Sequence, residues 1–160
     1  KEMLKLDSDF FLIIIGTGPL KEQLKAAINY GNLWNKVLWI ETIEYQDMYK
    51  YYIASDCLIN LCPAEIFGMA MLESMFYRRP VIAQYAAGPS EFIRDGETGY
   101  MCSNDNNITE WISKINLAFS DNSIIINNAY NLVCDKYLWN KQANNFINLI
   151  ETGNSIVEKM

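Results

Sequence analysis

Residues 57–77 read CLINLCPAEIFGMAMLESMFY, and this stretch sets the pattern for the chain. It starts with the apolar run Cys57 to Leu61, which has the length and composition of a strand buried on both faces. A loop follows, and from about Met69 to Tyr77 the sequence predicts a helix. A buried strand that leads through a short loop into a helix is the repeating unit of a parallel sheet.

The same unit occurs twice upstream. Phe10 to Ile15 is an apolar run that leads into a helix, and we expect Gly31 to close that helix. Val37 to Ile40 predicts a second strand, followed by a helix that carries Met48, Tyr52 and Ile53 on one face.

Downstream, the pattern continues for two more strands. Val81 to Ala83 and Tyr100 to Cys102 are the predicted strands, with a short helix from Ser90 to Ile93 between them. Asn107 to Glu110 has the form of a capping box that opens a helix. Two further helices are predicted at about 123–135 and 138–152.

This alternation predicts an α/β fold with a doubly wound parallel sheet, right-handed crossovers and C-terminal helices. The chain shows neither an internal repeat nor a linker, so we expect one domain over 1–160. The first six residues resemble the end of a helix rather than a signal peptide, which indicates a piece of a longer protein.

Composition excludes several classes of function. The 160 residues are 51% hydrophobic and 20% charged, as in a globular protein, and the net charge of -6 comes without a basic cluster for nucleic acid. The sequence has no histidine, which excludes a Ser-His or Cys-His nucleophile and, with the cysteine spacing, a zinc site. The four cysteines are expected as free thiols. No apolar run could span a bilayer, so membrane association would need segments outside this chain.

Open α/β sheets bind ligands at the carboxyl ends of their strands. The first strand-to-helix turn, Gly16-Thr17-Gly18-Pro19, lets backbone approach a ligand at Gly16 and Gly18. It lacks the third glycine of the dinucleotide fingerprint and the Lys-Ser/Thr of a P-loop. A tight turn needed only for geometry explains it equally well.

The second turn combines a glycine with two carboxylates. Gly68 lies at the start of the predicted helix, where free N–H groups and the helix dipole favour a phosphate. Glu65 lies in the loop before it, and Glu73 follows eight positions later. One carboxylate for a sugar and one for ribose hydroxyls, on either side of a phosphate-binding helix end, describe a nucleotide-sugar site. Each glutamate alone could instead be an acid that stabilises the helix dipole.

The third turn, residues 84–91, consists mostly of small residues that would keep space open. Glu91 lies near the predicted opening of the short helix. Glu91 could contact a ligand at this turn, and a helix cap is an equally good interpretation of it.

Several motifs follow one another in an order that resembles the C-terminal domain of family 4 glycosyltransferases with the GT-B fold. The resemblance covers about residues 10–150 and includes Leu138-Trp139. Its motifs are Gly16-Thr17-Gly18-Pro19, Glu65-Ile66-Phe67-Gly68, Leu72-Glu73-Ser74-Met75, Pro80-Val81-Ile82, Gly88-Pro89-Ser90-Glu91 and Gly96-Glu97-Thr98-Gly99-Tyr100.

The resemblance implies retaining transfer of a sugar from a nucleoside diphosphate, with no cofactor and no metal. Glu65 would be the catalytic residue at the donor sugar and Glu73 the ribose contact. Backbone amides around Phe67, Gly68 and Met69 would hold sugar hydroxyls and phosphates, and the base would lie near Ile40 and Glu41.

The family also implies partners outside this chain. The acceptor, a glycan or glycolipid, would bind a missing N-terminal domain, and the Arg and Lys that neutralise the diphosphate would lie upstream of residue 1. This chain alone should therefore bind donor weakly and turn over nothing. A cytoplasmic location, at the cytosolic face of a membrane, fits this picture.

Two departures bear on specificity. The family commonly has glycine where this chain has Glu41 and Arg78. Arg78, with Phe76-Tyr77 and Gly88-Pro89, resembles eukaryotic mannosyltransferases of lipid-linked oligosaccharides and favours GDP-mannose as donor. Two alternatives stay open: a catalytically silent sugar-nucleotide-binding subunit, and half of a nucleotide-sugar epimerase, against which the absence of histidine counts.

Overall fold

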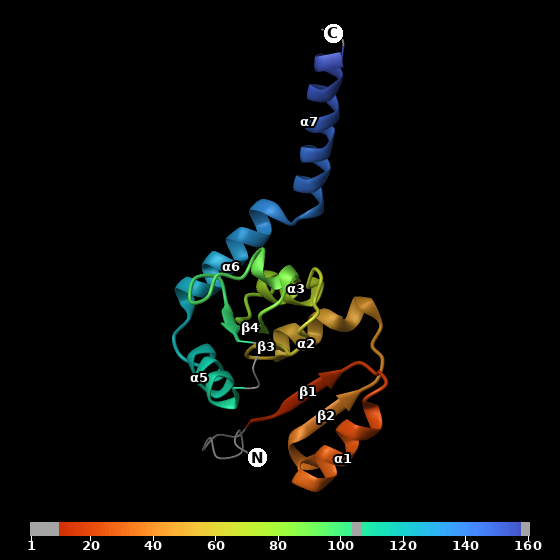
Figure 1. The fold of residues 1–160 in the computed structure, drawn as a ribbon, viewed down its shortest axis with the longest axis vertical. Coiled ribbons are helices and arrows are strands. Elements are labelled where there is room, and N and C mark those ends of the chain that lie inside the picture. Colours follow the sequence, from red (N-terminus) through yellow and green to blue (C-terminus); the bar gives the residue numbers. More distant parts are fainter. Residues whose placement is uncertain (1–9, 104–106, 158–160) are drawn as a thin grey trace. The chain divides into compact units, whose positions relative to one another are not determined.

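The computed structural model describes residues 10–103 and 107–157, and the chain divides into two compact units (Figure 1). The first unit is Lys1–Tyr51 and the second is Tyr52–Met160. A two-stranded sheet, β1-β2, lies in the first unit, and a three-stranded sheet, β3-β4-β5, lies in the second. All strand pairs are parallel, which confirms the predicted α/β class.

The first unit is a strand-helix-strand unit. β1 (Leu12–Ile15) pairs with β2 (Val37–Ile40) in register from Leu12↔Val37 to Ile15↔Ile40. The connection contains α1 (Lys21–Gly31) and the 3-10 turn η2 (Trp34–Lys36), and η3 (Tyr45–Asp47) follows β2. β2 has its predicted bounds, whereas β1 begins two residues later than predicted.

The end of α1 corrects one prediction. Gly31 is the last helical residue, and the left-handed residue that closes the helix is Asn32, with φ 53°. The Asn32 N–H donates to the carbonyls of Asn29 and Ile28. Asparagine tolerates this conformation better than other residues with a side chain, so it can replace glycine at a helix end.

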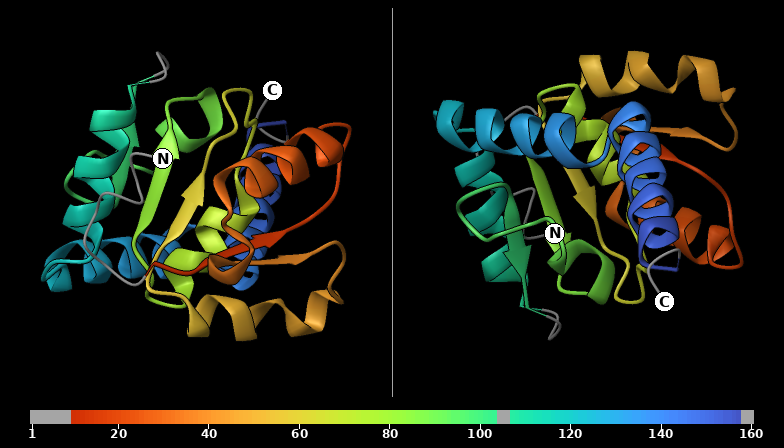
Figure 2. Two further views of the ribbon diagram at one scale, coloured as in Figure 1. Left: turned by 90° about the horizontal axis from the view of Figure 1, so that it is seen from below. Right: turned by 90° about the horizontal axis from the view of Figure 1, so that it is seen from above.

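In the second unit the strands lie in the order β3 (Leu58–Asn60), β4 (Val81–Gln84), β5 (Tyr100–Cys102), as Figure 2 shows. The first three residues of β4 are buried, which explains why its sequence is apolar without alternation. α2 (Met48–Ala54) crosses the boundary between the units and precedes β3.

Helices complete the second unit. α3 (Met69–Phe76) packs on β3, β4 and α6 (Ser123–Lys136), and α5 (Ile108–Ala118) packs on β4 and β5. α7 (Trp139–Val157) follows α6. The core joins residues of α3, β4, α6 and the segment after α4: Met71, Leu72, Met75, Val81, Ala83, Phe92, Ile93, Ala129 and Val133.

The short helix α4 (Ala87–Ser90) begins three residues before its predicted start. The extended Ala86 precedes it, and the Ser90 N–H donates to the Ala86 carbonyl. Phe92 and Ile93, predicted as helical, lie after the helix and pack in the core. Their burial, rather than their helical spacing, accounts for their apolar character.

Half of the predicted capping box is present. Asn107 Oδ1 accepts from the Glu110 N–H at 3.3 Å, as an N-cap should. The Glu110 carboxylate accepts from Ser103, through its N–H at 3.1 Å and its hydroxyl. Glu110 thus ties α5 to the end of β5.

The four cysteines are free, as predicted. Burial raises the pKa of Cys57 to about 11 and that of Cys102 to about 12. Over the part of the chain that the structure describes, no helix is both long and apolar enough to cross a membrane. The predicted helix end within the first six residues lies outside the described residues.

Candidate functional site

The glycine turn, Gly16 to Pro19, is tied to the second strand of its unit. The Gly16 N–H donates to the Ile40 carbonyl at 2.9 Å, and Trp39 Nε1 donates to the Gly16 carbonyl at 2.9 Å. Gly16 has φ 127°, a conformation that side chains disfavour. Apart from each glycine and its two chain neighbours, no heavy atom of the described residues lies within 4 Å of a Cβ added at Gly16 or Gly18. The structure therefore brings Gly16 and Ile40 together and leaves open space at the turn.

Glu41, the predicted base contact, forms an ion pair with Lys21 at the start of α1. The hydrogen bond from Lys21, together with its charge, lowers the pKa of the Glu41 carboxyl. The Lys21 N–H also donates to the Gly18 carbonyl at 3.0 Å. Lys21, which sequence reasoning missed, thus joins Gly18 and Glu41.

Glu65 lies in the loop between β3 and α3, residues 61–68, called the Glu65 loop below. Asn60 Nδ2 donates to Glu65 Oε2 at 3.3 Å, and the Phe67 N–H donates to Oε1 at 3.4 Å. Asn60 Oδ1 in turn accepts from the Cys62 N–H at 2.8 Å. Asn60 is a further residue that sequence reasoning missed, although an asparagine that ends a buried strand is a signal for such a turn.

Gly68 is the N-cap of α3 and has φ 94°. A Cβ added there would lie 2.3 Å from Met71 Cε and 3.2 Å from Phe92 Cζ. No side chain caps the helix at this position. The first N–H groups of a helix have no partner inside it, so this end of α3 can donate to an anion. Phe67 and Met69, on either side, are exposed by 43% and 56%.

Glu73 lies one to two turns inside α3 and is half-buried. Its Oε2 accepts from Tyr52 Oη at 2.8 Å. Tyr52 comes from α2 and is 5% exposed. The sequence placed Tyr52 on an apolar helix face and gave no sign of this contact.

The residues after β4, 85–93, form a second loop, called the Gly88 loop below, which touches the Glu65 loop. The Gly88 N–H donates to the Glu65 carbonyl at 3.1 Å. A Cβ added at Gly88 would lie 2.4 Å from the carbonyl carbon and oxygen of Ile66 and 2.6 Å from Phe67 N. The prediction that small residues keep space open here is wrong for Gly88, because backbone fills that space.

Glu91, in the Gly88 loop, is not at the opening of the short helix as predicted. The Glu91 residue is exposed, and it follows α4 instead of preceding it. The Glu91 N–H donates to the Gly88 carbonyl at 3.1 Å. Glu91 is therefore not an N-terminal cap.

Arg78 has φ 58°, the left-handed conformation that glycine adopts most easily. This conformation would explain the glycine that the family resemblance implies at this position. The Arg78 guanidinium donates to Asn127 Oδ1 at 2.7 Å and lies 3.8 Å from the centre of the Tyr130 ring. These contacts join the end of α3 to α6.

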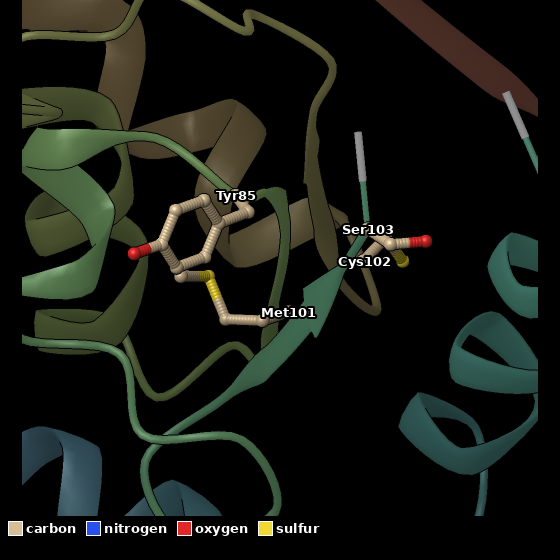
Figure 3. A pocket seen from close by; sticks show the side chains of 4 residues that line it. All are labelled: Tyr85, Met101, Cys102 and Ser103. Atoms are coloured by element: carbon tan, nitrogen blue, oxygen red, sulfur yellow. The ribbon is translucent and has the colours of Figure 1, made fainter. Parts of the chain in front are cut away.

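A pocket of about 330 Å³ lies at the carboxyl ends of β4 and β5. Figure 3 shows the Tyr85 ring against the Met101 side chain, with Cys102 and Ser103 beyond them. The pocket is lined by apolar surface rather than by the glutamates, so we regard the polar turns as the better candidate site. Among the described residues, no three His, Cys, Asp or Glu side chains are grouped to hold a metal ion.

Comparison with known proteins identifies the class. The family model described as "Glycosyl transferases group 1" matches residues 1–151. The chain therefore belongs to the group 1 glycosyltransferases, and its solved neighbours are glycosyltransferases with the GT-B fold.

Individual relatives agree with this assignment. The chain is 38% identical over 84 residues to the alpha-1,3/1,6-mannosyltransferase ALG2 of Dictyostelium discoideum, covering 52% of this chain and 20% of the relative. It is 28% identical to the C-terminal domain of LpcC, a group 1 glycosyl transferase of Francisella tularensis, with TM-score 0.71 and coverage of 86% and 75%. A variant of S. aureus TarM, solved with fondaparinux, alpha-GlcNAc-glycerol and UDP, is 26% identical, with TM-score 0.78 and coverage of 92% and 30%.

The chain spans about a fifth of the first curated relatives it matches, 20% and 21% of their lengths. The shared region is thus one part of those proteins.

Proposed function

We propose that this chain binds a nucleoside-diphosphate sugar and serves as the donor half of a retaining glycosyltransferase, with GDP-mannose as the donor. The acceptor, a glycan or glycolipid, binds a domain outside this chain. The protein acts in the cytoplasm, at the cytosolic face of a membrane that other segments contact. Neither a metal ion nor a cofactor takes part.

One observation carries the proposal: α3 begins at a left-handed glycine, without a side-chain cap, between two carboxylates. Amides at the start of α3, at Gly68 and Met69, donate to the diphosphate, and the helix dipole favours its charge. As the sugar leaves, negative charge builds on that diphosphate, so donors fixed there stabilise the transition state.

The two carboxylates take different roles. Glu65, next to the helix end, faces the donor sugar near its reacting carbon. Glu73, deeper in α3, accepts from the ribose hydroxyls. In the first unit, taken by itself, Gly16 and Gly18 leave room for a ligand to approach the backbone, and the family resemblance implies base contacts at Ile40 and Glu41.

The choice of GDP-mannose is supported by the likeness to a mannosyltransferase at 38% identity. A different donor is possible in this family, since the TarM variant was solved with UDP. A titration with GDP, UDP and ADP, followed through amide signals, shows which nucleotide the chain prefers. We expect the Gly68 and Met69 amides to shift most with GDP. If none of the nucleotides shifts them at millimolar concentration, the donor site is refuted.

A silent sugar-nucleotide-binding subunit is the alternative that one observation favours. The Glu65 carboxylate accepts from Asn60 and the Phe67 N–H, so it closes its own turn and could be purely structural.

Glu65→Gln keeps an oxygen acceptor and removes the charge. In the intact enzyme we expect the thermal midpoint to fall by no more than a few degrees, because one of the two hydrogen bonds to this side chain is lost, and turnover to fall by about 100-fold or more. Asp121→Asn is the matched control, since the exposed Asp121 carboxylate also accepts from an N–H two positions further on, that of Ser123 at 3.1 Å, in the turn between α5 and α6. Unchanged turnover in Glu65→Gln would favour the silent subunit.

A further inference from the structure

The contact between α2 and α3 gives the Glu73 carboxylate a defined position. Tyr52 Oη donates to Glu73 Oε2 at 2.8 Å, and both residues belong to the second unit. A hydrogen bond to a charged acceptor is stronger than one between neutral groups. The Tyr52 hydroxyl is therefore well suited to fix one oxygen of this carboxylate.

Tyr52 is itself held in place. Its ring is 5% exposed and stacks on Tyr77, with ring centres 5.7 Å apart and planes 13° from parallel. Next to it, Arg79 Nη2 donates to the Ile53 carbonyl at 2.9 Å, which places a positive charge at the C-terminal end of α2. The phenol is thus presented from a packed helix rather than from a loop.

Such support has a consequence for binding. A free glutamate side chain samples several rotamers, and ordering it on binding costs free energy. A carboxylate has about four acceptor positions, and the bond from Tyr52 occupies only one of them. A neutral phenol donor also leaves the charge of the carboxylate in place.

We infer that Tyr52 is a positioning residue that orients Glu73 before the donor ribose binds. The inference rests on the proposed role of Glu73 as the ribose contact. It adds a residue on a different helix, 21 positions away in sequence.

The test is a ratio of affinities. GDP and 2′,3′-dideoxy-GDP differ only in the ribose hydroxyls, so the ratio of their dissociation constants measures the ribose contact. We expect the unmodified chain to prefer GDP by about tenfold, as for a hydrogen bond to a charged group. Tyr52→Phe keeps the ring and removes the hydroxyl. It should lower that preference to about threefold or less while leaving the affinity for the dideoxy nucleotide unchanged.

Tyr130→Phe is the matched control. Tyr130 is also a stacked tyrosine, but it is half-buried and packs on Phe76 and Arg78. Tyr130→Phe should leave the ratio of the two dissociation constants as it is in the unmodified chain. Thermal midpoints of both variants should stay within a few degrees of the unmodified chain.

Different results separate the inference from the function it rests on. If the unmodified chain binds both nucleotides equally, the ribose role of Glu73 is wrong. If it prefers GDP and Tyr52→Phe keeps the full preference, Tyr52 does not position Glu73 and the donor site stands. In a Glu73→Ala background, which has no side-chain acceptor for either hydroxyl, Tyr52→Phe should change the ratio no further. A second, additive loss there would show that Tyr52 acts by another route.

Discussion

The glycine turn of the first unit and the paired loops of the second unit use the same residue in opposite surroundings. At Gly16 and Gly18, an added Cβ would meet no heavy atom of the described residues within 4 Å, apart from the glycine and its chain neighbours. At Gly88, an added Cβ would meet backbone of the Glu65 loop at 2.4 Å, and at Gly68 it would meet Met71 at 2.3 Å. At Gly88 and Gly68, the absence of a side chain allows parts of the second unit to touch each other. At Gly16 and Gly18 of the first unit, the space stays available to a ligand, although Gly16 is also needed for its backbone angle.

This difference assigns separate tasks to regions that look alike in sequence. The Gly88 contact fixes the shape of the Glu65 loop, and so fixes where Glu65 and the start of α3 lie. No comparable packing is seen around an added Cβ at Gly18, so the approach of a ligand there stays part of the proposed function. Substitutions at the two places should therefore affect different properties.

Gly88→Ala should have the largest effect. Because the added methyl group meets rigid backbone, the two loops must separate, at a cost of about 3 kcal/mol, the upper end for overpacking. For a chain of this size, that predicts a fall in the thermal midpoint of roughly 6 to 12 °C. Thermal unfolding followed by circular dichroism measures it. An unchanged midpoint would show that the loops do not pack as described.

Substitution of Arg78 should have an effect on stability between those at Gly88 and Gly18. Arg78 has a side chain although its backbone is in the left-handed conformation. Arg78→Ala removes the contacts with Asn127 and Tyr130 and keeps the unfavourable backbone angle. Arg78→Gly removes the same contacts and also the steric strain of the left-handed backbone, because glycine has no Cβ. The glycine variant should be more stable than the alanine variant by about 1 kcal/mol. Urea unfolding of both variants measures the difference, and equal stabilities would contradict a strained backbone at this position.

Gly18→Ala should have the smallest effect on stability and a selective effect on binding. The free energy of unfolding should change by less than about 0.5 kcal/mol, because the methyl group meets nothing in the described structure. The affinity for GDP should fall, since the methyl group occupies space that the donor uses. A variant that binds GDP as well as the unmodified chain would remove Gly18 from the donor site. One that loses stability would remove the contrast with Gly88.

Local sequence signals predicted most of the elements. β2 and β5 have their predicted bounds, because each is a short apolar run between turn residues. The start of α3 at Met69 also agrees, since Gly68 marks it. α4 was misplaced because Phe92 and Ile93 are apolar for reasons of burial, which helical spacing does not distinguish.

The features that sequence could not reveal depend on segments that are distant along the chain. Gly88 meets residues about 20 positions away, and Tyr52 meets Glu73 across 21 positions. Neither partner is signalled by periodicity or turn composition, because both follow from how helices and loops pack on β3 and β4. The roles of Glu65 and Glu73 come from the family likeness, and they remain predictions.

The contact at Gly88 also limits how this protein can be re-engineered. Backbone of one loop rests on backbone of the other, without a side chain between them to absorb a change in length. An inserted residue near Ile66 would push against Gly88 and shift α4 as well. Anyone who transplants the Glu65 loop into a related scaffold, to exchange one sugar preference for another, should move residues 85–93 with it.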